Sequence, residues 1–144
     1  MSELQLVQDY LELCAAKARY CRFLDTKDWE AWRELMTEDY ELDISEGTGI
    51  AVIHGRDEAI ARVRASIGEA KTAHQVHNPE IRIDGDVALA TWALQDRVVF
   101  GPQRPSITGY GHYHERWLRR NGEWKIAALR LTRLHLDLHP AASS

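Results

Sequence analysis

Apolar residues at the start of the chain recur every three or four positions, which is the spacing of one face of an α-helix. They predict a helix from Glu3 to about Leu24, with Ser2 able to cap it. One apolar stripe runs through Val7, Leu11, Cys14, Ala18 and Cys21, and a second runs beside it through Tyr10, Leu13, Lys17, Tyr20 and Leu24. The next step of the first stripe is Asp25. We therefore expect this carboxylate to point at the interior, where a buried charge needs a partner.

The following residues predict two further helices with a short hairpin between them. Residues 27–36 fit a helix whose inner side carries Trp29, Trp32, Leu35 and Met36. Residues 39–44 alternate like a strand, and residues 50–54 return as its partner after a glycine-containing turn. A third helix is expected from about Asp57 to Ile67.

The second half of the chain has the pattern of long strands, at about residues 72–83, 86–99, 106–120 and 123–137. Among the turns between them, the Asn-Gly pair at 121–122 is the strongest hairpin signal. Helices followed by an antiparallel meander are typical of an α+β domain. We therefore expect an α+β fold in which three N-terminal helices pack on a strongly curved, mostly antiparallel sheet that forms a cone with an interior pocket.

Length and composition fit one domain spanning residues 1–144, with residues 139–144 as a frayed tail. The chain is 44% hydrophobic and has a formal net charge of −4. It contains no block of five like charges and no apolar run near the roughly 20 residues that a membrane span needs. Neither a nucleic acid nor a membrane is therefore expected as a partner.

The two cysteines indicate a reducing compartment. Cys14 and Cys21 are seven residues apart on the first predicted helix, so their Cα atoms would lie about 10 Å apart, too far for a disulfide within the chain. They fit small core residues of a protein that is not oxidised. The N-terminus is acidic from Glu3 and lacks the charged and apolar regions of a signal peptide, so a cytoplasmic protein is predicted.

Three stretches carry a resemblance to a known family: 19-RYCRFLDTKDWEAW-32, 72-TAHQVHNPEIRIDGDVALATW-92 and 118-LRRNGEWKI-126. With the order of elements, they make nearly the whole chain resemble the SnoaL-like branch of the nuclear-transport-factor-like (cystatin-like α+β) superfamily. The motifs look most like the subgroup of scytalone dehydratase, bile-acid dehydratase and hexachlorocyclohexane dehydrochlorinase. The resemblance implies a pocket histidine, His74, oriented by Asp25, with Tyr20 matching the pocket tyrosine of the bile-acid enzyme. The same scaffold hosts isomerases, cyclases, dehydratases and non-catalytic binders.

His74 and Asp25 are the candidate catalytic pair. A histidine suits proton abstraction near neutral pH, and a carboxylate bonded to one ring nitrogen fixes the tautomer and stabilises the imidazolium. The alternative is a satisfied core histidine, with Asp25 only capping the next helix. On a regular strand His77 points to the face opposite His74, which argues against a metal site from the HxxH spacing. Asn78 shares the parity of His74 and could line the pocket or hold the turn before Pro79.

The stretch 109-GYGHYHERW-117 places His112 and His114 on one face of a strand. A cupin-type metal site also uses such a pair, but here Glu115 is adjacent and points the other way, so a metal-dependent enzyme is only a third hypothesis. The opposite face carries Gly111, Tyr113, Glu115 and Trp117. The resemblance implies that Tyr113 faces the pocket, where its hydroxyl could donate to a substrate oxygen. A purely structural core aromatic is the alternative.

Three more residues are candidate substrate contacts. Arg130 shares a face of the last strand with Ala128 and Thr132, and it could bind a carboxylate or an oxyanion if that face lines the pocket. A surface or interface arginine is the alternative. Tyr40 and Trp29 are candidate wall or core aromatics. Apolar residues on both faces of the last strand are consistent with a homodimer or homotrimer: Leu129, Leu131, Leu134 and Leu136.

The sequence contains no P-loop, dinucleotide fingerprint, serine-hydrolase elbow or zinc-type cysteine pair, so the simplest interpretation needs no cofactor. We expect a cofactor-independent lyase of the dehydratase type, or an isomerase, whose His-Asp dyad removes a proton from a small apolar cyclic or polyketide-like substrate. The alternative is a non-catalytic binding or assembly module, akin to the small subunit of ring-hydroxylating dioxygenases. An open pocket with a hydrogen-bonded Asp25 and His74 favours the enzyme, and a pocket filled by side chains favours the module.

Overall fold

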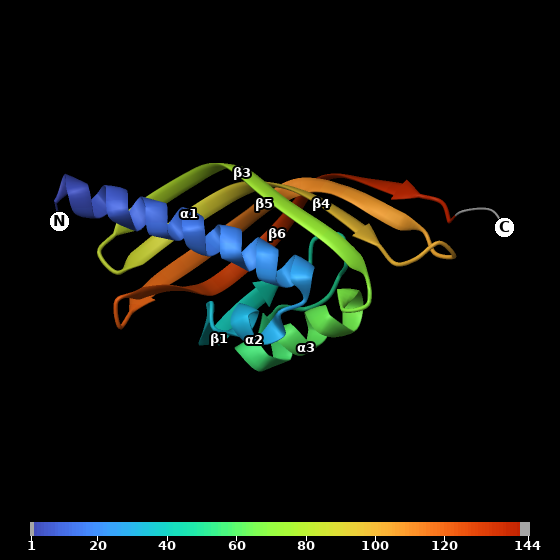
Figure 1. Cartoon of the computed structure of the whole chain (residues 1–144), viewed down its shortest axis with the longest axis horizontal. Coiled ribbons are helices and arrows are strands. Elements are labelled where there is room, and N and C mark those ends of the chain that lie inside the picture. Colours follow the sequence, from blue (N-terminus) through green and yellow to red (C-terminus); the bar gives the residue numbers. More distant parts are fainter. Residues whose placement is uncertain (1, 142–144) are drawn as a thin grey trace.

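The computed structural model describes residues 2–141, and Figure 1 shows how their helices and strands are arranged. The helices of this range are α1 (Glu3–Thr26), α2 (Trp29–Arg33) and α3 (Arg56–Ile67). Its strands are β1 (Met36–Asp43), β2 (Ile53–His54), β3 (Lys71–Asp84), β4 (Val87–Val99), β5 (Ser106–Arg120) and β6 (Glu123–His139).

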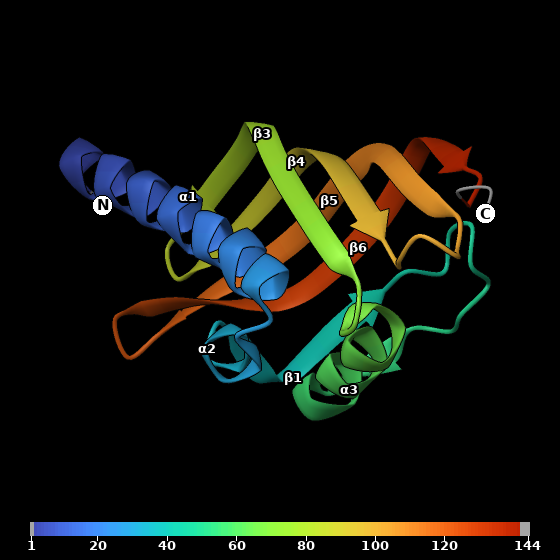
Figure 2. The same ribbon diagram turned by 45° about the vertical axis from the view of Figure 1, so that its right-hand side comes forward.

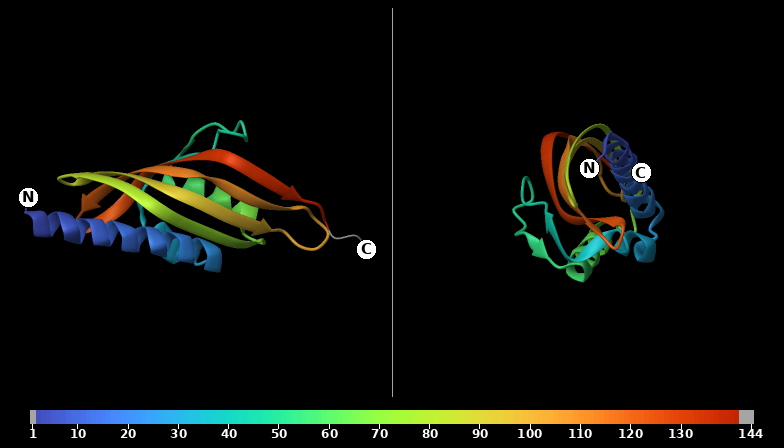
Figure 3. Two further views of the ribbon diagram at one scale, coloured as in Figure 1. Left: turned by 90° about the horizontal axis from the view of Figure 1, so that it is seen from above. Right: turned by 90° about the vertical axis from the view of Figure 1, so that its left-hand side faces the viewer.

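The strands form one mixed sheet in the order β2-β1-β6-β5-β4-β3. Neighbouring strands are antiparallel, except that β1 runs parallel to β6. The sheet curls without closing, and the helices lie on its inner side, as the turned view and the view along the long axis show (Figures 2 and 3). The predicted α+β fold, with three N-terminal helices on a strongly curved sheet, is confirmed.

Helix α1 begins and ends with recognisable caps. The side chain of Ser2 accepts a hydrogen bond from the backbone N–H of Gln5 at 3.1 Å, which supplies one of the unpaired donors of the first turn. At the other end, Lys27 takes the left-handed conformation (φ 61°) and its N–H bonds to Leu24. This cap stops the helix just after Asp25, which lies one turn beyond Cys21 and beside strand β3.

The first apolar stripe predicted for α1 is mostly wrong, because of its five residues only Cys21 is buried. Val7 and Leu11 are more than half exposed, whereas the neighbouring stripe supplies the fully buried Leu13 and Lys17. The rotation follows from Asp9, which is buried and forms an ion pair with Arg119 at 2.5 Å. Because an unpaired buried carboxylate is costly, this pair fixes which side of the helix faces the sheet.

Several boundaries differ from the prediction, and the strand expected at 50–54 is reduced to β2. The second helix ends at Arg33, because Met36 already begins β1 and is buried in the core. At the C-terminus, β6 continues to His139, whose ring bonds to the Thr108 hydroxyl at 2.9 Å. Of the expected frayed tail, residues 142–144 lie outside the described residues.

Bulges interrupt two of the long strands. In β3 the pairing with β4 shifts between His77 and Glu80, where Asn78 has a positive φ of 50°. In β6 the pairing with β5 skips Leu134, which is 74% exposed. A bulge adds one residue and so changes which side chains of a strand face inward.

Candidate active site

A cavity of about 350 Å³ lies between the inner face of the sheet and the helices. Its polar lining gathers His74, Tyr20, Tyr113, Asp96, Arg133 and Glu46. The rest is largely apolar, with Ile44, Ile50, Val63, Ile67, Val98, Phe100, Ile107, Leu129, Leu131 and Leu136. A hollow that combines an apolar wall with a few converging polar groups is typical of a small-molecule site.

Asp25 and His74 meet at one edge of this cavity. The Asp25 carboxylate lies 2.7 Å from Nδ1 of His74 and also accepts the backbone N–H of His74 at 2.8 Å. The side chains are 23% and 7% exposed, respectively. Since Nδ1 faces the carboxylate, it carries the proton in the neutral ring, and Nε2 is left as a base on the opposite edge of the imidazole.

The carboxylate of Asp25 is itself held in place by Thr72. The Thr72 hydroxyl donates to Asp25 at 2.9 Å and accepts from the ammonium of Lys27 at 2.8 Å. Burial lowers the pKa of Lys27, and the charge of Asp25 partly opposes this effect. Sequence analysis missed both residues, although Thr72 lies two positions before His74 on the same strand and therefore shares its face.

Tyr20 and Tyr113 also line the cavity, as the resemblance implies. Their rings are 6.2 Å apart in an edge-to-face arrangement, and both side chains are at most 5% exposed. Burial, followed by the charges of neighbouring groups that include Glu115, raises the pKa of both phenols well above the usual value. They therefore stay protonated near neutral pH and can donate hydrogen bonds.

Arg133, and not Arg130, is the arginine of β6 that lines the cavity. Arg130 is exposed on the outer face of the sheet and does not line the cavity, so the pocket role predicted for it is wrong. Arg133 lies next to the bulge of β6 and makes a two-pronged ion pair with Asp96, at 2.6 and 3.0 Å. Asp96 is the cross-strand neighbour of His74. Sequence parity missed this pair because the face of β6 that lines the cavity could not be read from alternation alone.

Three further predicted contacts do not line this cavity. Tyr40 is 1% exposed and belongs to the packed core. Trp29 packs edge-on against Trp32 at 5.6 Å between ring centroids, and Trp32 is the indole that reaches the cavity. Asn78 is exposed at the β3 bulge, where its left-handed backbone breaks the alternation that was expected to point it inward.

A second ion pair lies behind the tyrosines and is sealed from water. Lys17 and Glu115 are 2.5 Å apart, and both side chains are 0% exposed. The indoles of Trp92 and Trp117 donate to the Glu115 carboxylate at 2.7 and 2.9 Å. The Lys17 ammonium lies 3.7 Å from the ring centre of Tyr20 and 4.0 Å from that of Tyr113, which is cation–π distance.

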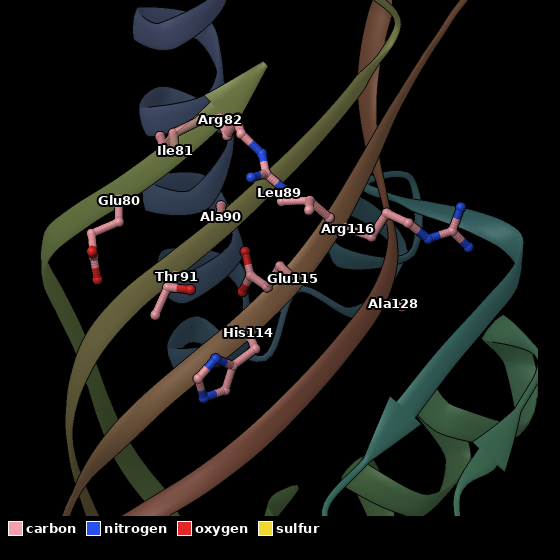
Figure 4. A pocket seen from close by; sticks show the side chains of 10 residues that line it. All are labelled: Glu80, Ile81, Arg82, Leu89, Ala90, Thr91, His114, Glu115, Arg116 and Ala128. Carbon is pink, nitrogen blue, oxygen red and sulfur yellow. The ribbon is translucent and has the colours of Figure 1, made fainter. Parts of the chain in front are cut away.

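The outer face of the sheet has its own shallow hollow, shown in Figure 4 with α1 behind the strands. His114 borders it and its Nε2 lies 2.9 Å from the Thr132 hydroxyl. The ring centroids of His112 and His114 are 6.2 Å apart. Between residues 2 and 141, no group of three or more His, Cys, Asp or Glu side chains is arranged to hold a metal ion. This hollow lacks the acid–base pair that the inner cavity contains.

Among the described helices, none is both long enough and apolar enough to cross a membrane.

Comparison with known proteins gives a family. Residues 5–130 match the model of a family described as SnoaL-like domain. A protein of Gibberella zeae named probable cyclase FGR4 is 26% identical over 133 residues, covering 85% of this chain and 89% of that protein. The family model covers the chain from helix α1 to the middle of strand β6.

Solved structures share the fold at lower identity. A hexachlorocyclohexane dehydrochlorinase (LinA) type 2 superposes with a TM-score of 0.84, at 17% identity over 99% of this chain and 95% of that chain. A proposed scytalone dehydratase from Novosphingobium aromaticivorans gives 0.83, at 21% identity over 99% and 96%. These likenesses confirm the fold.

Proposed function

This chain belongs to the SnoaL-like family, and from this premise we propose that it is a cofactor-independent lyase or isomerase acting on a small, mostly apolar substrate. The names of its relatives support an enzyme of this type: a cyclase, a scytalone dehydratase and a dehydrochlorinase. The observation that carries the proposal is the Asp25–His74 hydrogen bond at the edge of an open cavity. A satisfied core histidine would have no such cavity beside it.

His74 is the proposed general base. Its Nε2 removes a proton from a carbon next to a carbonyl or a leaving group, and Asp25 stabilises the imidazolium that forms. In an elimination, the electrons of the broken C–H bond form a C=C bond, hydroxide departs, and a proton from the imidazolium converts it to water. In an isomerisation, the imidazolium returns the proton to another carbon. Elimination of water is the preferred reaction.

Tyr20 and Tyr113 are the proposed hydrogen-bond donors to a substrate oxygen. Both hydroxyls remain protonated because burial raises the pKa of each phenol. A donor aimed at an oxygen that gains negative charge lowers the barrier, and removing one such donor from an enzyme typically costs about 10²–10³ in turnover. The apolar wall of the cavity would hold the carbon skeleton of the substrate.

A substrate screen tests this function. Hydroxylated cyclic ketones are incubated with the protein, and formation of a conjugated C=C bond is followed by ultraviolet absorbance. The wild type should convert at least one member, His74→Ala should not, and His77→Ala should behave as the wild type because His77 is exposed on the other face. Full turnover by His74→Ala would overturn the mechanism, and tight binding without any turnover would favour a binding module.

Self-association and a reducing, cytoplasmic location remain part of the proposal. Leu134 and Leu138 are 74% and 68% exposed near the end of β6, which supports a contact with a second copy. Light scattering that shows only monomer would remove this part. Both cysteines are free thiols on α1, which supports a reducing compartment.

A further inference from the structure

The guanidinium of Arg133 is already occupied inside the cavity. Its two terminal nitrogens bind the two oxygens of Asp96, at 2.6 and 3.0 Å. The Asp96 side chain is only 5% exposed and that of Arg133 is 20% exposed. The backbone N–H of Arg133 also binds the carboxylate of Glu46 at 2.6 Å, so side chain and main chain each face an acid. The fork that normally recognises a carboxylate ligand is therefore taken by the protein itself.

Strand β5 lies between Asp96 and Arg133, and a glycine on it leaves room for their ion pair. Asp96 is on β4 and Arg133 on β6, and the pair crosses β5 at Gly109, the register partner of Asp96. A Cβ at Gly109 would lie 2.2 Å from a terminal nitrogen of Arg133 and 2.3 Å from an oxygen of Asp96. Any larger residue would push the pair out of place. The absence of a side chain at this position thus keeps the guanidinium bound to its acid.

A negatively charged ligand would meet a poor environment here. It would have to displace Asp96 from Arg133, which would leave a buried carboxylate unpaired. It would also approach Glu46 on the rim. Arg62 is the other cation among the cavity-lining residues, and it is exposed on α3. The cavity would therefore discriminate by making an anionic ligand bind poorly, and not only by making an uncharged ligand bind well.

We propose that the cavity selects uncharged substrates, bound through hydroxyl or carbonyl oxygens, and that Asp96 is the residue that rejects carboxylates. This inference rests on the proposed function only in placing the substrate in this cavity. An uncharged oxygen can accept from the tyrosines while Arg133 stays paired. Removing the charge of Asp96 should free the Arg133 guanidinium and allow the cavity to bind a carboxylate ligand.

Two ligands of the same shape test the proposal by calorimetry at neutral pH. 2-Naphthamide is uncharged and 2-naphthoate is its anionic counterpart. The wild type should prefer the amide, whereas Asp96→Asn should gain about tenfold or more in affinity for the naphthoate and change by less than about threefold for the amide. The double variant Asp96→Asn/Arg133→Gln is the matched control and should lose the gain.

The outcomes separate this inference from the reaction mechanism, because binding needs no turnover. Equal or tighter binding of naphthoate by the wild type, or no gain in naphthoate affinity in Asp96→Asn, overturns the proposal. If Asp96→Asn does not fold, Asp96→Ser removes the same charge with a smaller side chain and must show the same gain. If the proposed proton transfer by His74 is wrong, the preference for the uncharged ligand can still hold. If that preference is absent, turnover of an uncharged substrate can still occur.

Discussion

The two faces of strands β4, β5 and β6 carry their charges in opposite ways. On the inner face, Asp96 pairs with Arg133 and Glu115 pairs with Lys17, and the acids are at most 5% exposed. On the outer face, Arg116 and Arg130 are exposed to water. The same alternating sequence therefore produces one face where each charge has a fixed partner and one where water supplies the solvation.

On the inner side of the sheet, the Lys17–Glu115 and Asp25–His74 pairs differ in their access to the cavity. Lys17 and Glu115 are sealed from water, and two indoles donate to the Glu115 carboxylate, which fits a role in holding the fold. The Asp25–His74 pair borders the cavity, which leaves one ring nitrogen free for chemistry. The difference predicts that mutations of the first pair act on stability and mutations of the second act on turnover.

The largest effect is expected on turnover, for His74→Ala. Loss of a general base typically lowers the rate by about 10²–10⁴, and the fold should persist because His74 is on the cavity edge. Turnover on a substrate found by the screen and the circular-dichroism spectrum measure the two quantities. An unfolded variant would mean that this pair, too, is structural.

The largest effect on stability is expected for Glu115→Gln. It leaves the buried ammonium of Lys17 without its counter-charge, which should lower the free energy of unfolding by about 3–5 kcal/mol. Removing both charges, in Lys17→Met/Glu115→Gln, should recover most of this loss, because the amide oxygen can still accept from the two indoles. Urea unfolding measures each variant, and a single variant as stable as the wild type would show that the pair is not charged as drawn.

A smaller effect separates two glycines of β5. A Cβ at Gly111 would lie 2.0 Å from the backbone oxygen of Thr132, which cannot move without shifting β6. Gly111→Ala should therefore cost about 1–3 kcal/mol of stability. Gly109→Ala meets the ends of flexible side chains and should cost less. Equal unfolding midpoints for the two variants would contradict the close approach at the bulge.

The smallest effect concerns the outer face and pH. Burial lowers the pKa of His114 below 6.5, and the charges of Arg130 and His112 lower it further. Its neutral form is thus favoured by folding, so its stabilising contribution is present above pH 6.5 and is lost as the pH falls through its lowered pKa. Arg130→Gln should move the midpoint of the His114 NMR titration slightly upward. No shift would show that Arg130 does not act on this ring.

Alternation along the sequence predicted β5 well and β6 poorly, for physical reasons. The inward Tyr113 and Glu115 and the outward His114 follow from a regular strand. The choice between Arg130 and Arg133 depends on which face of β6 turns inward. That face is set by the extra residue Ala127 in the pairing with β5, which has no signal in the local sequence. Register and bulges are set by neighbouring strands.

For helix α1, too, the local sequence pattern predicts the element but not its orientation. A stripe of apolar residues located α1, but its rotation depends on the partner of Asp9, which is Arg119, 110 positions away. Asp25 was expected to face inward from that stripe, and the structure places it against His74 because the helix cap at Lys27 ends the last turn there. Contacts between distant residues decide what periodicity leaves open.

The tautomer of His74 tests the central claim most directly. Nitrogen-15 NMR of the neutral imidazole reports which ring nitrogen carries the proton, with His77 as a solvent-exposed reference. The wild type should have the proton on Nδ1 of His74, and Asp25→Asn should lose this preference. A proton on Nε2 in the wild type, or the same tautomer in both proteins, would contradict the role of Asp25 in preparing His74 as a base.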